Sequence, residues 1–292
     1  MVQSAALVDV PRLQRELAGD RPPVLLDVRW SLGGPAGATE YAQGHLPGAV
    51  FVDLETQLSR PRRPGEGRHP LPDPEVLQEA LRAAGVHEDT PVVVHDAADS
   101  TSAARAWWVL RWAGLGDVRV LDGGLAAWTA HGGPLTTDVS RPVPGDVVVR
   151  PGALPVLDAG ALPALTRTGV LLDVRAPERY RGEAEPVDPV AGHVPGARNL
   201  PTTQHVTAAG TFDRPEQLRA RFDAAGVRPG VEVGVYCGSG VTAAHTLLAL
   251  EVAGLSGTLY PGSWSEWITD LTRPVATGPD PDDAPDDDAP RA

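Results

Sequence analysis

The amino-acid sequence predicts two α/β domains in tandem, each with three layers and a central parallel sheet. Three observations support this fold class. The chain has 292 residues, about twice the length of a typical domain. Four motifs occur twice in the same order, and in each half short apolar runs alternate with stretches of helical periodicity. Strands that alternate with helices are typical of a parallel sheet with helices on both faces.

The internal repeat spans a whole domain. The first half contains, in order, VLLDVR (24–29), GHLPGA (44–49), VVVHD (92–96) and LDGGLAAW (121–128). The second half contains VLLDVR (170–175), GHVPGA (192–197), VGVYC (233–237) and LYPGSWSEW (259–267). The motifs of the two copies begin 138 to 148 residues apart, too long a period for a solenoid. We therefore expect four segments, a first domain at 1–137, a linker at 138–155, a second domain at 156–277 and a tail at 278–292.

The individual elements follow from the same patterns. The VLLDV and VVVHD runs are short, apolar and bounded by Pro, Gly or charged residues, as in strands buried on both faces of a sheet. Segments 104–114 and 242–254 follow such strands with helical periodicity and end at Gly, which commonly stops a helix. Segment 136–152 is rich in Pro and polar residues, so we expect an extended strap between the domains.

Composition and charge exclude several classes of function. The net charge is −13, and −8 without segment 280–292, so the basic face that nucleic-acid binding requires is not expected. Segment 280–292 is acidic and lacks large apolar residues, so we expect the tail at 278–292 to be disordered. No apolar run approaches the ~20 residues of a membrane span, and the N-terminus has no signal-peptide pattern. We therefore expect a cytoplasmic protein that does not bind membranes.

The single cysteine, Cys237, is the candidate nucleophile. One cysteine excludes internal disulfides and multi-thiolate metal sites, and the eight His residues show no HxxxH or HxH pair, so no metal is expected. Cys237 ends an apolar strand, and the loop after it contains Gly238 and Gly240 and leads directly into a helix. Backbone N–H groups of residues 238–243 can then surround the sulfur and lower the pKa of the thiol. The carboxyl end of a strand is also where parallel α/β sheets bind ligands.

Three motifs resemble those of a known family. The loop CGSGVTA (237–243), the repeated GH(L/V)PGA and the closing YPGSWSEW are similar to motifs of the two-domain rhodanese family of thiosulfate and 3-mercaptopyruvate sulfurtransferases. The resemblance covers about residues 10–275. It implies a catalytic second domain and a rhodanese-like first domain that has lost its cysteine. The position that matches Cys237 in the first copy is Asp96, which agrees with this implication.

The resemblance also implies a two-step sulfur transfer without a metal or an organic cofactor. The Cys237 thiolate would take sulfur from a small anionic donor and become a persulfide. The outer sulfur would then pass to cyanide or to a thiol acceptor, including a protein thiol such as that of thioredoxin. Backbone groups of Gly238, Gly240, Val241 and Thr242 would stabilise the negative sulfur. The alternative is a persulfide carrier or sensing module that acts only on a protein partner.

The loop motif favours one donor over the other. CGSGVTA is the loop of the family's mercaptopyruvate enzymes, and neutral Gly238 and Ser239 lack the two basic residues that suit dianionic thiosulfate. The resemblance further implies a proton relay of Ser239, His69 and an acid near Asp53 or Glu55.

Of the two arginines that mercaptopyruvate enzymes would use to bind the donor, only one has a counterpart in this sequence. Arg179 matches an arginine shared by both enzyme types, whereas the second arginine of mercaptopyruvate enzymes should fall near Val187, where none occurs. Both donors are anions and the catalytic loop has no cationic side chain. We therefore expect Arg179 to anchor the donor through its guanidinium.

Two other enzyme classes are excluded by single positions. A cysteine-based phosphatase needs an arginine six residues after the nucleophile, where this chain has Ala243. A dinucleotide-binding loop needs an acid ~20 residues later, where Thr258, Leu259 and Tyr260 stand.

Residues that recur at matching positions are expected to stabilise the fold, because only one copy has a nucleophile. They form three pairs, Asp27 and Asp173, Arg29 and Arg175, and His45 and His193. Each of these arginines should pair with the aspartate two positions before it. The histidines of GHxPGA should stabilise turns.

Overall fold

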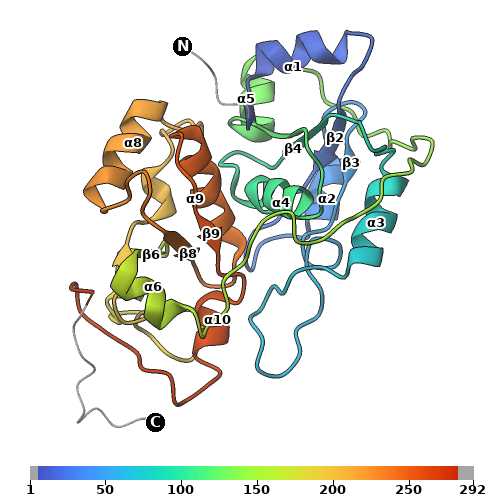
Figure 1. The fold of residues 1–292 in the computed structure, drawn as a ribbon. Helices are drawn as coiled ribbons and strands as arrows, with labels where there is room; N and C mark the ends of the chain where they lie inside the picture. The colour runs from blue at the N-terminus through green and yellow to red at the C-terminus, as the bar shows by residue number, and fades with distance from the viewer. Residues whose placement is uncertain (1–5, 282–292) are drawn as a thin grey trace.

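A computed structural model describes residues 6–281 and contains two α/β domains side by side (Figure 1). The strands of the first sheet are β1 (Leu7–Val8), β2 (Val24–Asp27), β3 (Val50–Phe51), β4 (Val92–His95) and β5 (Val118–Leu121). They are all parallel and lie in the order β1-β5-β4-β2-β3. The helices of this domain are α1 (Val10–Leu17), α2 (Gly37–Gln43), α3 (Pro74–Ala83), α4 (Thr101–Trp112) and α5 (Gly124–Ala130).

The second domain repeats this topology with a shorter sheet. Its strands are β6 (Val170–Asp173), β7 (Arg198–Asn199), β8 (Val233–Tyr236) and β9 (Thr258–Leu259), all parallel and in the order β7-β6-β8-β9. A single parallel bridge between Val156 and Leu259 stands where the first domain has β1. The helices are α6 (Leu162–Thr168), α7 (Pro177–Tyr180), α8 (Pro215–Ala224), α9 (Val241–Val252) and α10 (Ser263–Trp267), with a 3₁₀ turn η1 (Thr202–Gln204). The predicted fold class, a tandem duplication with central parallel sheets, is confirmed.

The central strands carry the sites. The residues of β4, β6 and β8 are all buried, as expected for strands covered by helices on both faces. Asp173 of β6 is in register with Tyr236 of β8, so the carboxyl ends of these two strands are adjacent. The loops that follow β6 and β8 therefore open onto the same edge of the second sheet.

The domains meet through α4 and α9, which make the most extensive contact between any two elements (Figure 1). Both helices are buried over most of their length, and one hydrophobic cluster joins Trp107 and Leu110 of α4 to Leu248 and Leu250 of α9. Helices that are apolar on all sides are buried in this way. The helices predicted at 104–114 and 242–254 are present, and both lead out of the loops that follow β4 and β8.

The predicted strap has no helix or strand between residues 138 and 155 and runs along the first domain (Figure 1). Its backbone bonds to α3 and to the end of α4, with Gly145 N–H donating to Arg82 O at 2.8 Å and Arg150 N–H to Ala113 O at 2.8 Å. The predicted domain boundaries remain predictions. Disorder was expected from residue 278, but Gly278 N–H donates to Arg181 O at 2.9 Å and Gly196 N–H to Pro281 O at 2.7 Å. The rest of the predicted tail, 282–292, lies outside the described residues.

In the described part of the chain, each helix is too short or too polar to cross a lipid bilayer.

Candidate active site

Cys237 follows β8 directly and is 1% exposed. Its sulfur accepts a hydrogen bond from the backbone N–H of Gly240 at 3.1 Å. Gly240 is the N-cap of α9 and has a φ of 80°. A Cβ atom there would lie 2.5 Å from the carbonyl oxygen of Pro261, so both the conformation and the close approach require glycine. The sulfur therefore lies at the N-terminus of a buried helix, where a negative charge is stabilised.

The closing motif LYPGSWSEW holds the Cys237 loop from behind. The N–H groups of Trp264 and Ser265, in α10, donate to the carbonyl oxygens of Cys237 and Gly238, both at 2.9 Å. The Ser263 hydroxyl accepts from the N–H of Cys237 at 3.2 Å. These bonds fix the loop backbone, which leaves the sulfur as the reactive group of the loop.

The amides expected around the sulfur are only partly seen in contact with it. Among the described residues, only the N–H of Gly240 donates a hydrogen bond to Cys237 Sγ. Val241 and Thr242 are the first two residues of α9, where backbone N–H groups have no partner within the helix. These groups, together with Gly238, remain predicted contacts of the outer sulfur of a persulfide.

The first copy holds a carboxylate where the second holds sulfur. Asp96 follows β4, and its Oδ1 accepts from the N–H groups of Ala98 at 3.2 Å and Ser100 at 3.1 Å. Its Oδ2 accepts from the N–H groups of Ser102 at 3.0 Å and Ala103 at 3.1 Å, and from the Ser102 hydroxyl. Burial raises the pKa of Asp96 to about 6. The first loop is thus an anion-binding turn occupied by its own side chain.

Ser239 and His69 come together although they lie in different domains. A hydrogen bond of 2.8 Å joins Ser239 Oγ to His69 Nδ1, and both residues are 7% exposed. Trp30 packs edge-on against the His69 ring, with 5.3 Å between ring centroids. Burial, helped by the charges of Arg105 and Arg68, lowers the pKa of His69 to about 4. The ring is therefore neutral at pH 7 and can exchange a proton with the serine.

The prediction that an acid near Asp53 or Glu55 contacts His69 and completes the proton relay is wrong. Asp53 accepts hydrogen bonds from the N–H groups of Glu55 and Thr56, both at 2.9 Å. Glu55 accepts from Trp30 Nε1 at 3.1 Å. Neither carboxylate bonds to His69, and among residues 6–281 no other acid does. The charged groups that act on His69 are arginines instead.

Arg179 reaches the catalytic loop from α7. A Cβ atom at Gly238 would lie 3.7 Å from both terminal nitrogens of Arg179. The guanidinium is already paired, with Glu185 at 2.6 Å and with Asp188 at 3.2 Å. Arg179 therefore lies beside the catalytic loop, within a network of charges rather than as an isolated cation, and its role as the donor anchor stays a prediction.

Arg68 is a second arginine at the loop, and sequence reasoning missed it. A Cβ atom at Gly238 would lie 2.9 Å from Arg68 Nη2, and Arg68 Nη1 forms an ion pair with Asp188 Oδ1. Arg68 comes from the first domain. The sequence feature that could have identified Arg68 is its position directly before His69. If His69 contacts Ser239, its neighbour in the same loop must also lie near the catalytic loop.

A third arginine, Arg105 of α4, was also missed. It is 0% exposed, and its guanidinium donates to the carbonyl oxygens of Gly240 at 3.3 Å and His69 at 3.1 Å. It has no carboxylate partner within the described chain. Burial lowers the pKa of Arg105 to about 10, and the negative charge of Cys237 acts against this shift. The signal was a single charge among the apolar and small residues of 102–110.

Arg105 and His245 make matching contacts across the domain interface. Each is the fifth residue after its helix N-cap, Ser100 for α4 and Gly240 for α9. His245 Nε2 donates to the carbonyl oxygen of Asp99 in the first loop at 3.1 Å. Burial lowers the pKa of His245 to about 4, so its ring is neutral. The duplicated architecture thus presents a permanent cation to the loop with the nucleophile and a neutral group to the other.

The recurring residues have the structural contacts that were predicted. Arg29 pairs with Asp27 at 2.8 Å and Arg175 with Asp173 at 2.6 Å, and all four side chains are buried. In the turns, the GHxPGA histidines bond to backbone carbonyls at 2.8 Å, His45 to Tyr41 and His193 to Tyr180.

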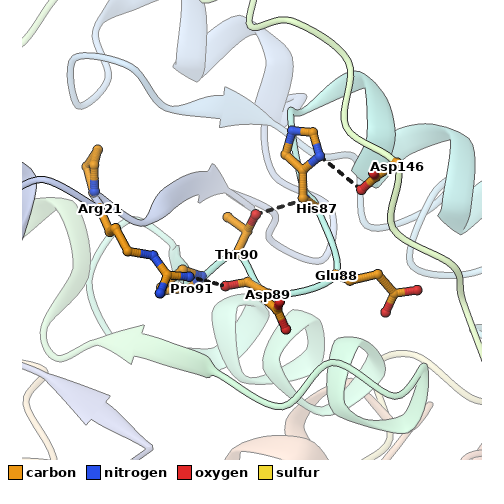
Figure 2. Close-up of a pocket in the computed structure, with 8 residues that line it drawn as sticks. Arg21, His87, Glu88, Asp89, Thr90, Pro91 and Asp146 are labelled. Atoms are coloured by element: carbon orange, nitrogen blue, oxygen red, sulfur yellow. Dashed lines mark hydrogen bonds and ion pairs between the residues drawn. The ribbon is translucent and has the colours of Figure 1, made fainter.

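A hollow in the first domain lies away from this site. It has a volume of about 380 Å³ and contains the pair of His87 and Asp146, whose nitrogen and oxygen are 2.9 Å apart (Figure 2). Pro91, which lines it, immediately precedes β4, so the hollow is at the amino ends of the strands. Ligand sites of parallel sheets lie at the opposite edge, where Cys237 is.

Comparisons with known proteins agree with the duplicated fold. The model of the rhodanese-like domain matches twice, at residues 10–131 and 159–270. A Pseudomonas aeruginosa protein named as a 3-mercaptopyruvate sulfurtransferase is 50% identical over 285 residues, 95% of this chain and 100% of its own length. A Mycobacterium tuberculosis protein named as a thiosulfate sulfurtransferase, SseB, is 50% identical over 267 residues, 89% of this chain and 93% of its own.

A solved structure gives the same result. The crystal structure of SseA from Escherichia coli matches with a TM-score of 0.79 and 34% sequence identity, over 89% of this chain and 99% of SseA. Sequence, domain models and fold therefore agree, and the chain belongs to the two-domain rhodanese family of sulfurtransferases.

Proposed function

We propose that this protein transfers a sulfane sulfur atom from a small anionic donor to a nucleophilic acceptor through a persulfide on Cys237. One observation supports this most directly. The only cysteine of the chain is at the N-terminus of a buried helix, and its sulfur accepts the N–H of Gly240 at 3.1 Å. Such a position stabilises both a thiolate and the negative outer sulfur of a persulfide.

The first step forms the persulfide. The Cys237 thiolate attacks the thiol sulfur of 3-mercaptopyruvate or the outer sulfur of thiosulfate, and a new S–S bond forms as the donor's S–C or S–S bond breaks. The electron pair leaves with the enolate of pyruvate, which takes up a proton, or with sulfite. Only the enolate needs a proton, and we infer that it comes from the Ser239 hydroxyl, which is hydrogen-bonded to neutral His69.

The second step returns the enzyme to its starting state. Cyanide or a thiolate attacks the outer sulfur, the persulfide S–S bond breaks, and the electron pair remains on Cys237. In both steps Arg105 stabilises Cys237 as a thiolate, because it is a buried cation without a carboxylate partner among residues 6–281. A protein thiol of the thioredoxin type is one acceptor of this class, and we place the reaction in the cytoplasm.

Steady-state kinetics test this function and separate it from a carrier that serves only a protein partner. We expect parallel lines in double-reciprocal plots when donor and cyanide are varied, because the donor product leaves before the acceptor reacts. Cys237→Ser should abolish thiocyanate formation. If the wild-type protein accepts sulfur but passes none to cyanide or small thiols, the carrier function replaces the enzymatic one.

A further inference from the structure

We propose that Arg68 is the second donor-binding arginine and that Asp188 sets the charge that the donor meets, so that the site prefers a singly charged 2-oxo-3-thiol carboxylate over doubly charged thiosulfate. This inference rests on the proposed function and names its donor class. It assigns specificity to a pair of residues from different domains.

The position of Arg68 carries the first step of the argument. Its Nη2 would be 2.9 Å from a Cβ atom at Gly238, the residue after the nucleophile, and Arg179 would be 3.7 Å from the same atom. The two guanidiniums therefore flank one side of the catalytic loop. Arg68 Nε is buried and has no hydrogen-bond partner in the described chain, so a donor group for an incoming anion is available.

Asp188 joins the two arginines. Its Oδ1 pairs with Arg68 and its Oδ2 lies 3.2 Å from Arg179. Its side chain is 5% exposed, so the carboxylate is part of the site rather than of the surface. The position one residue before it is Val187, where the second arginine was expected from the family resemblance and does not occur. Arg68 approaches from the other domain and supplies the missing cation.

Charge balance gives the selectivity. Arg68 and Arg179 carry two positive charges, and Asp188 and Glu185 carry two negative charges, so the group is neutral as a whole. The Arg175 and Asp173 pair beside Glu185 adds no net charge. A monoanion brings a single negative charge, which the two arginines can bind. A dianion places a second negative charge near the same carboxylate, and the repulsion is strong because the surroundings are largely buried.

The test compares donors in matched variants. Asp188→Asn removes one negative charge at the site, and we expect kcat/KM for thiosulfate to rise at least fivefold relative to kcat/KM for 3-mercaptopyruvate. Asp188→Glu should restore the wild-type ratio. The control is Glu183→Gln, which removes a charge from an exposed residue paired with Arg181 and should change the ratio by less than twofold.

Arg68 is tested in the same assay. Arg68→Gln should raise KM for either donor at least tenfold while changing the rate of the cyanide step by less than twofold. The backbone N–H of Arg68 donates to Ser265 Oγ at 3.0 Å, so the loop keeps this anchor when the side chain is changed. Arg181→Gln is the matched control and should leave KM unchanged.

A binding measurement separates this inference from the proposed function. In a Cys237→Ser background, calorimetry can compare sulfate as the dianion with pyruvate as the monoanion, without any turnover. Asp188→Asn should strengthen sulfate binding at least fivefold relative to pyruvate. An unchanged ratio in both assays overturns the inference, even if the enzyme transfers sulfur. A shifted binding ratio without turnover by the wild-type protein would overturn the proposed function alone.

Discussion

Replacement of Asp96 by alanine should destabilise the protein strongly while leaving sulfur transfer nearly unchanged. Asp96 is the counterpart of Cys237, is 3% exposed, and receives four backbone N–H groups and one hydroxyl. No part of it reaches the catalytic loop. The substitution therefore removes an internal anion from one loop without touching the nucleophile in the other.

The magnitude follows from the groups left behind. Asp96→Ala leaves four N–H groups without their acceptor, each at a cost of roughly 1–3 kcal/mol when no water replaces it. Two effects offset part of this cost. Water can enter and accept some of the N–H groups, and the unfavourable burial of a charged carboxylate, which raises the pKa of Asp96 to about 6, is removed. We expect the free energy of unfolding to fall by about 4 kcal/mol. Asp96→Asn retains one acceptor oxygen and should lose about half as much.

The assay combines urea unfolding with turnover at a temperature at which both variants are folded. The control is Asp99→Ala, in the same loop, because Asp99 is exposed and its side chain accepts a single N–H, from Thr101 at 3.1 Å. It should lose about 1 kcal/mol. For both variants kcat should remain within threefold of the wild type.

Two outcomes would refute this reasoning. A hundredfold loss of kcat in folded Asp96→Ala, about 2.7 kcal/mol of barrier, would mean that the first loop takes part in the chemistry. An unchanged unfolding free energy would mean that the four N–H groups do not depend on the carboxylate.

Three further predictions address the site and its pH dependence. Arg105→Met should slow the alkylation of Cys237 by iodoacetamide at pH 7 at least fivefold, because a buried cation that favours the thiolate is lost, whereas Arg111→Met, on the same helix but paired with Glu251, should change the rate by less than twofold. Ser239→Ala should reduce turnover of 3-mercaptopyruvate at least tenfold more than turnover of thiosulfate, since only the enolate needs a proton; equal losses would limit Ser239 to packing. Acidification from pH 7.5 to 5 should cost about 3 kcal/mol of stability in urea titrations. The folded state binds protons less well than the unfolded state at three histidines, each losing about 2 kcal/mol, and better at two aspartates, each returning about 1.4 kcal/mol. The groups are His69, His205 and His245, with pKa values lowered by burial to about 4, 3 and 4, and Asp96 and Asp122, both raised to about 6. Stability that is constant or rises toward pH 5 would contradict this balance.

Local sequence patterns predicted most of the fold. VLLDV and VVVHD are strands that are buried on both faces of their sheets. Such strands appear in the sequence as continuous runs of apolar residues, so they can be predicted from consecutive positions alone. The duplication placed Cys237 and Asp96 at matching strand ends. The family resemblance also predicted that Ser239 and His69 are neighbours. They are 170 residues apart in the sequence, and Ser239 Oγ lies 2.8 Å from His69 Nδ1 in the structure.

The charged residues around the site could not be predicted from local sequence patterns. Arg68 and Arg105 belong to the first domain, and their importance arises from contacts between segments far apart in the chain, which no local periodicity encodes. The acid expected near Asp53 failed for the same reason, since a place in the sequence does not fix the direction of a side chain in a long loop. Asp188 was overlooked because an aspartate in a Pro-rich segment is usually exposed, whereas here its side chain is 5% exposed.

Intact-mass spectrometry of the protein after incubation with donor alone tests the central claim most directly. We expect the mass to rise by one sulfur atom, the added atom to map to the peptide that contains Cys237, and cyanide to remove it. Cys237→Ser should show no gain. A sulfurtransferase activity that survives in Cys237→Ser, or a wild-type protein that turns over without ever gaining sulfur, would contradict a persulfide on Cys237.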